Sequence, residues 1–201
     1  MIVNTITFSE KSKGWTSFWD YEPTFAFSIN GRYFTTNEGS VYEHYAGTVH
    51  GSFYGVVYPS EVSVVLNENP SIPKNFKTVN YEGSNGWEVS EILSDEFKPS
   101  SNEFGNSASL DSATAISSYS EGKYLDGGVS YRSGFDRKEN KYYANIKSNG
   151  VIIREGEVLT SDKTSGIKGF YCTVTFKTDE TTDIGGSKQL FSVSSEYVQS
   201  S

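Results

Sequence analysis

Apolar and polar residues alternate with a period of two through much of the chain, which is typical of half-buried β-strands. Phe25, Phe27 and Ile29, for example, fall on one side of such a run. The dipeptide Asn30-Gly31 follows, and Asn-Gly between two β-prone runs favours a type I′ hairpin turn because both turn residues need positive φ. The pattern predicts a three-stranded meander with strands at residues 25–29, 32–36 and 41–45.

Further strands are expected wherever β-branched and aromatic residues gather between turn residues. They lie at residues 53–58, 61–66, 76–81, 87–93, 142–147, 151–159, 169–177 and 189–198. The run 169–177 alternates most regularly, so we expect Thr173 and Thr175 to face solvent or a neighbouring subunit. The face expected to be buried consists of Phe170, Cys172, Val174 and Phe176.

Helix signals are nearly absent, so the sequence predicts an all-β protein built of antiparallel meanders. The pattern leaves open whether these meanders form one sandwich or two small β units. Residues 94–122 differ from the rest because they are rich in Ser, Asn, Asp and Glu and show no clear alternation. The predicted organisation is an aromatic-rich β unit at 1–93, a polar excursion or linker at 94–122 and a second β unit at 123–201, with a single domain formed by both β units as the alternative.

The composition makes aromatic rings the main source of burial. Only 35% of the 201 residues are hydrophobic, whereas 14 Tyr, 13 Phe and 3 Trp bring the aromatic share to 15%, and each ring buries roughly 150–250 Å². The net charge of −8 argues against binding nucleic acid through its phosphates. No apolar run has the length of a membrane span and the first residues lack the pattern of a signal peptide, so we expect no membrane insertion.

The sequence offers no constellation of residues that would carry chemistry. His44 and His50 have no cysteine or acidic cluster near them at a metal-ligand spacing. The single cysteine, Cys172, lies on an apolar strand face, where a cysteine acts as a small hydrophobic residue. Asp95 and Glu96 would point to opposite sides of a strand, and the acidic residues are interpreted as a solvated surface. We therefore predict no catalytic residue, no bound metal and no cofactor.

The segment 14–23 holds the densest group of rings. Strict alternation would put Trp15, Trp19 and Tyr21 on one side and Phe18 on the other, where Phe18 would belong to the core. The three aligned rings fit a core face, an anchor for a partner protein or a sugar-binding face, and the sequence leaves these alternatives open.

The excursion at 94–122 has few residues that can add to a core, and ordering a backbone costs roughly 1–2 kcal/mol per residue. We expect it to become ordered against a partner. Its candidate anchors are Phe97, Phe104, Leu110 and Tyr119.

Several blocks of the sequence carry a resemblance. They are KGWTSF (13–18), GSVYEH (39–44), SFYGVVY (52–58), GFDRKENKYY (134–143), SGIKGFY (165–171) and LFSVSSE (190–196). Together they resemble a block found in large virion proteins of tailed bacteriophages. The resemblance is to structural tail or neck proteins of crAss-like and related phages, such as the muzzle-type proteins at the distal end of the tail. It covers most of the chain outside the 94–122 excursion, and the relatives of this type are far longer.

The resemblance implies a structural component of the virion, made in the bacterial host cytoplasm, that acts in the tail or the head–tail (neck) assembly. Its expected partners are other virion proteins and copies of itself in an oligomeric ring. Two alternatives from other classes stay open. One is a carbohydrate-binding module or receptor-binding tip that uses the face of Trp15, Trp19 and Tyr21, and the other is a glycan-degrading enzyme on the same β scaffold.

Overall fold

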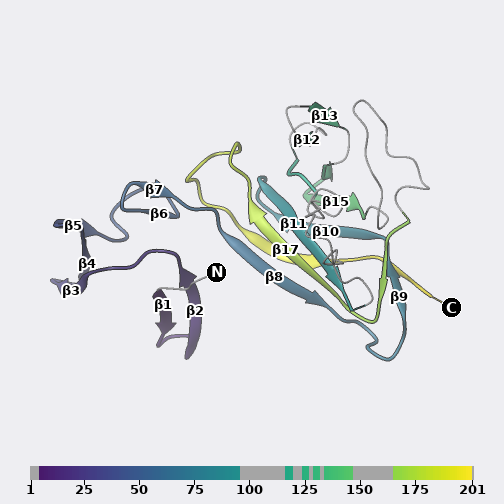
Figure 1. The fold of residues 1–201 in the computed structure, drawn as a ribbon, viewed down its shortest axis with the longest axis horizontal. Helices are drawn as coiled ribbons and strands as arrows, with labels where there is room; N and C mark the ends of the chain where they lie inside the picture. Colours follow the sequence, from purple (N-terminus) through teal and green to yellow (C-terminus); the bar gives the residue numbers. More distant parts are fainter. Residues whose placement is uncertain are drawn as a thin grey trace, which may run out of the picture. The chain divides into compact units, whose positions relative to one another are not determined.

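The computed structural model describes residues 5–95, 116–119, 124–126, 129–131, 134–146 and 165–200. Every regular element among these residues is a β-strand and all strand pairs are antiparallel, which confirms the all-β prediction (Figure 1). The chain divides into two compact units, one of residues 1–58 with 184–187 and one of residues 59–183 with 188–201. The predicted organisation into β units at 1–93 and 123–201, with a linker at 94–122, stays a prediction.

The first unit contains three small antiparallel sheets. Their strands are β1 (Thr5–Ser9) with β2 (Gly14–Trp19), β3 (Phe25–Ile29) with β4 (Arg32–Asn37) and β5 (Ser40–Glu43), and β6 (Ser52–Phe53) with β7 (Val56–Val57). The β3–β4–β5 meander was predicted at these positions and is confirmed. Its first turn has positive φ at Asn30 (51°) and Gly31 (73°), as a type I′ turn requires.

The prediction of a single strand at residues 53–58 is wrong. The chain instead reverses within this run, because Tyr54 and Gly55 both have positive φ (53° and 84°) and form the turn of the β6–β7 hairpin. Gly55 adopts such a backbone without steric cost, so the glycine in the middle of the run marks the reversal.

The second unit contains the two longest described strands, β11 (Trp87–Ser94) and β17 (Cys172–Thr178), which lie side by side in Figure 1. One sheet has the order β14-β15-β10-β18, a second β11-β17-β8, a third β16-β9-β19, and β12 pairs with β13. The bounds are β8 Glu61–Leu66, β9 Lys74–Phe76, β10 Thr78–Gly83, β11 Trp87–Ser94, β12 Tyr124–Asp126, β13 Val129–Tyr131, β14 Asp136–Lys138, β15 Lys141–Asn145, β16 Ile167–Gly169, β17 Cys172–Thr178, β18 Leu190–Ser194 and β19 Tyr197–Gln199.

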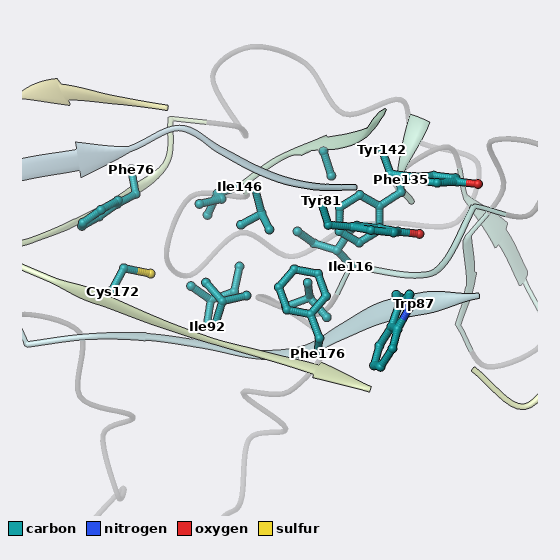
Figure 2. Packing of buried hydrophobic residues seen from close by; sticks show 14 of the residues in the cluster. Phe76, Tyr81, Trp87, Ile92, Ile116, Phe135, Tyr142, Ile146, Cys172 and Phe176 are labelled. Carbon is teal, nitrogen blue, oxygen red and sulfur yellow. The ribbon is translucent and has the colours of Figure 1, made fainter. Parts of the chain in front are cut away.

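The core of the second unit lies between residues of β10 and β15 on one side and residues of β11 and β17 on the other (Figure 2). Tyr81 of β10 stacks on Tyr142 of β15 with ring centroids 4.6 Å apart. Across the core, the ring of Phe176 meets Tyr81 edge to face at 5.8 Å. Rings from strands far apart in the sequence thus supply much of the burial, as the composition predicts.

The strand expected at 169–177 is largely confirmed, with two corrections. Cys172, Val174 and Phe176 are fully buried, but Phe170 lies between β16 and β17 and is 39% exposed. Thr175 was expected to face outward and is instead buried. Because β17 is the central strand of its sheet, Thr175 is covered by its neighbours, and its Oγ1 lies 2.9 Å from Oγ of Ser63 on β8.

Only the two ends of the excursion at 94–122 fall within the described residues. Ile116 is buried and exchanges both backbone hydrogen bonds with Val89 of β11. Tyr119 packs against the core, with its ring edge to face on Tyr142 at 5.9 Å. The candidate anchors Phe97, Phe104 and Leu110, and the strand expected at 151–159, lie outside the described residues.

Candidate protein-interaction surfaces

The β1–β2 hairpin of the first unit carries an apolar face that is open to solvent. Phe8 pairs with Trp15 and Thr7 pairs with Ser17, so Thr16 is an extra residue in β2 and forms a β-bulge. The bulge places Trp15 and Phe18 on the same face, together with the residues they pair with, Phe8 and Ile6. All four side chains are exposed, and Trp15 and Phe18 are 63% and 67% exposed. We call Ile6, Phe8, Trp15 and Phe18 the hairpin face.

The bulge overturns two predictions based on strict alternation. Phe18 was expected in the core and is one of the most exposed rings of the hairpin. Trp15 was expected beside Trp19 and Tyr21, but it contacts Phe8 on the hairpin face with ring centroids 5.2 Å apart. Trp19 lies on the other face, where its indole Nε1 donates a hydrogen bond of 2.6 Å to Thr7 Oγ1. The three rings therefore do not form one platform.

The β3–β4–β5 meander carries a second open apolar face. Phe27 stacks on Phe25 and on Phe34 of β4, with ring centroids 6.0 and 5.4 Å apart. Ile29 and Val41 extend this row of rings, because they lie at alternate positions of β3 and β5. Phe25 is 63% exposed, and Ile29 and Val41 are each more than half exposed. We call Phe25, Phe27, Ile29, Phe34 and Val41 the meander face.

The opposite side of the meander is closed by a cluster of aromatic and polar side chains. Thr35 of β4 is fully buried, and its Oγ1 lies 2.7 Å from His44 Nε2 and 3.0 Å from the hydroxyl of Tyr54. The ring of Tyr21 stacks on Phe53 at 4.5 Å and lies 5.2 Å from the ring of His44. Burial holds the pKa of His44 below its ordinary value and raises the pKa of the Tyr21 hydroxyl. The side of the meander that carries Thr35 is thus part of a small core, whereas the meander face is exposed to solvent.

A hollow of about 450 Å³ lies next to this aromatic cluster. Trp19, His44, His50 and Phe53 are among the residues that line it. His50 is fixed there by its backbone N–H, which donates to the carbonyl of Gly185 at 2.7 Å. The two histidines, six residues apart in the sequence, therefore line the same hollow. Their spacing in the sequence did not predict this.

A single ion pair borders the meander face. The guanidinium of Arg32 donates two hydrogen bonds to the carboxylate of Glu43, and it also lies over the ring of Phe34 at 5.4 Å. The hydrogen bonds from Arg32 lower the pKa of Glu43 and raise that of the guanidinium, so both groups are charged at neutral pH. The pair leaves the centre of the face uncharged.

The described residues offer no evident centre for metal or acid–base chemistry. No group of three or more His, Cys, Asp or Glu side chains among them could hold a metal ion. Cys172 is buried in the second unit, and burial raises the pKa of its thiol to about 12, so the reactive thiolate is absent at neutral pH. Within the same part of the chain, no helix could span a membrane.

The meander face was missed as a surface because alternation predicts which residues share a side but not whether that side is covered. Phe25, Phe27 and Ile29 were expected to be half-buried for this reason. One signal was available in β4, where Tyr33 and Phe34 are neighbours and must point to opposite faces. A strand with rings on both faces indicates that both faces pack against other residues. Within the described part of this chain, only the face of β4 that carries Tyr33 is covered.

Comparison with known proteins identifies the family of the chain. No curated protein matches the chain. Residues 48–149 match the family described as the Crassvirus muzzle protein C-terminal domain, and the match covers half of the chain. The matched residues begin after the meander and contain β6 to β15, so the hairpin face and the meander face both lie outside them. The chain therefore belongs to the family of the Crassvirus muzzle protein C-terminal domain.

Proposed function

We propose that this chain, a structural component of a phage virion by its family, works in the tail or the head–tail assembly as a subunit of an oligomeric ring. It would act through protein–protein contacts with other virion proteins and with copies of itself. The observation that carries the proposal is the pair of open apolar faces on the first unit, the hairpin face and the meander face.

The chemistry of the two faces suits protein contact. Monomeric proteins rarely expose large contiguous apolar patches, and such patches mark interaction sites. Phe and Trp are enriched at the centres of protein interfaces, where they act as rigid anchors. The side chains of both faces stand on β-strands, so they are positioned before a partner arrives and little conformational entropy is lost on binding. The proposal assigns the chain no reaction, in keeping with a family of structural proteins.

The proposal is tested by placing a charge on one face and measuring incorporation into particles. Phage encoding Phe25→Glu are purified, and the amount of this chain per particle is measured by quantitative mass spectrometry. Because a buried unpaired charge is costly, we expect a loss of about tenfold or more. Phe191→Glu is the matched control, since Phe191 is 72% exposed but lies in the second unit. Equal incorporation of both variants would contradict the proposal.

The aromatic hollow supports a second candidate function, binding of a glycan. A pyranose ring can pack its C–H face against an aromatic ring, and Trp19, Phe53 and His44 line the hollow. Titration with saccharides, followed by isothermal titration calorimetry, tests this candidate with a readout that does not depend on the tryptophans. A binding signal that is lost in Trp19→Ala and retained in Trp15→Ala would support it, because Trp15 lies on the opposite face of the hairpin.

A further inference from the structure

Charged residues lie at one end of each open face of the first unit, and the charges at the two faces have opposite sign. The turn between β1 and β2 contains Lys11 and Lys13, both exposed, with only Glu10 as an acid between the two strands. This turn adjoins the end of the hairpin face at which Phe8 pairs with Trp15. Neither lysine has an ion pair within the described residues. The hairpin face therefore ends in a basic turn.

Acidic residues lie at one end of the meander. Glu38 lies in the turn between β4 and β5, and Glu22 lies just before β3. Both are exposed and lie at the end of the meander at which Phe25 pairs with Thr36. The Arg32–Glu43 pair lies toward the other end and neutralises itself. Each face is thus an apolar row with a charged end, and the two charges are opposite.

We propose that copies of this chain bind one another, with the hairpin face of one copy on the meander face of the next and Lys11 and Lys13 of the first beside Glu22 and Glu38 of the second. This inference rests on the proposed function, because it names the partner of the two faces. Burying the two apolar rows drives the contact. The charged ends set its orientation, since electrostatic complementarity mainly determines register and partner choice.

A second copy fits these faces better in this arrangement than in a symmetric one. Two hairpin faces pairing with each other would bring no acidic turn to Lys11 and Lys13. Two meander faces would bring no free cation to Glu22 and Glu38, because Arg32 is already paired with Glu43. Since each copy carries a net charge of −8, contacts without such compensation also meet the repulsion of the two chains.

A contact between two different faces repeats itself, because every copy keeps one free face of each kind. Such heterologous contacts form a closed ring when the rotation closes and an open filament when it does not. The two faces hold four and five apolar side chains, against roughly 20–30 residues on each side of a standard interface, so we expect weak association of the isolated chain. Inside a particle, neighbouring subunits raise the effective concentration and make the same contact stable.

The experiment is sedimentation velocity on the purified full chain up to about 0.5 mM, a range that detects dissociation constants weaker than micromolar. The variants are Trp15→Glu on the hairpin face, Phe25→Glu on the meander face and Phe191→Glu as the control. We expect the wild-type chain and the control to grow in mass with concentration, and each face variant alone to stay monomeric. An equimolar mixture of the two face variants should form dimers and nothing larger, since only one intact pair of faces remains.

Charge-reversal variants provide a second test in case a face variant fails to fold. All four residues are exposed, so Lys11→Glu with Lys13→Glu, and separately Glu22→Lys with Glu38→Lys, leave the packing intact. Each reversed chain alone should associate about tenfold more weakly than wild type. Combining all four substitutions in one chain should restore the association.

Three results would overturn the inference. They are a wild-type chain that stays monomeric over the whole range, a face variant that still associates with itself, and a mixture of face variants that forms no dimer. None of them touches the proposed function, which is tested by the content of purified particles. A monomeric chain that is still incorporated in a Phe25-dependent way would assign the meander face to a different virion protein.

Discussion

At the scale of single residues, the Phe176 side chain shows how much the second unit depends on its rings. Phe176 has no exposed surface, meets Tyr81 edge to face and lies 6.3 Å from the ring of Phe135. Truncating such a ring removes its transfer free energy and leaves a cavity that the surrounding strands cannot fill.

We predict that Phe176→Ala lowers the free energy of unfolding by about 3–5 kcal/mol, the range found for buried aromatic residues. Urea denaturation followed by circular dichroism measures the change. Phe191→Ala serves as the control because its ring is exposed, and it should shift the midpoint little. A Phe176→Ala midpoint equal to that of the control would show that the core is packed in another register.

His44 gives the first unit a dependence of stability on pH. Burial lowers its pKa below the ordinary value near 6.5, so the folded protein holds the ring neutral. The unfolded chain binds a proton as the pH falls through 6.5, and protons therefore favour unfolding. The contribution of His44 to stability is fully present above pH 6.5 and is lost as the pH falls through its folded pKa.

We predict that His44→Gln makes the stability of the first unit less sensitive to pH between about 7 and 5.5, because glutamine can replace the hydrogen bond to Thr35 but does not titrate. Thermal unfolding at several pH values provides the measurement, followed by tryptophan fluorescence in a Trp87→Phe background, so that only Trp15 and Trp19 of the first unit report. His50→Gln, which replaces the other histidine of the hollow, is measured in parallel as the matched control. A slope unchanged from wild type in His44→Gln would contradict this account.

At the scale of elements, local rules predicted the strands well wherever a turn residue marked the boundary. Asn30-Gly31 located the first turn of the meander, and β8 begins and ends at the predicted residues, Glu61 and Leu66. The misplaced rings of the β1–β2 hairpin have a different cause. Thr16 is an extra residue in the β2 bulge, so it changes the side on which the later side chains of β2 lie. A periodic pattern in the sequence does not predict such a bulge.

Close approach between strands limits another element. Gly83 ends β10 where the register with β18 shifts, and a Cβ there would lie 2.3 Å from the carbonyl oxygen of Gln189. The contacting atoms belong to the backbone, so they cannot rotate away. Glycine is therefore required at this position for space between the two strands.

We predict that Gly83→Ala lowers the free energy of unfolding by about 1–3 kcal/mol, as overpacking does. Glu82→Ala, one residue earlier, removes only an exposed pair with Lys141 and should cost little. Urea denaturation of both variants makes the comparison. Equal stability of the two would mean that β10 and β18 separate without cost and that the close approach is not a constraint.

At the scale of the whole molecule, composition and alternation sufficed for the fold class. Few helix signals, many rings and a single cysteine pointed to an all-β chain whose burial comes from aromatic side chains, and the second unit has such a core. Which apolar faces stay open could not be read from the sequence. Phe25 and Phe176 follow the same alternating pattern, and only the tertiary structure covers one and leaves the other exposed.

The first unit carries several large apolar side chains that its own fold does not cover. Trp15, Phe18, Phe25 and Val41 contribute little to the stability of the isolated chain because solvent still reaches most of their surface. They contribute burial free energy only when a partner removes that surface from water. We therefore expect the hairpin face and the meander face to be covered in the particle.

Hydroxyl-radical footprinting of the free chain and of purified particles measures this coverage, because it reports the solvent exposure of individual side chains. We expect Trp15, Phe18 and Phe25 to be oxidised rapidly in the free chain, where they are exposed. Their oxidation rates should fall at least several-fold in the particle. Equal rates in the free chain and in the particle at these three residues would show that neither face is covered and that the proposed contacts do not form.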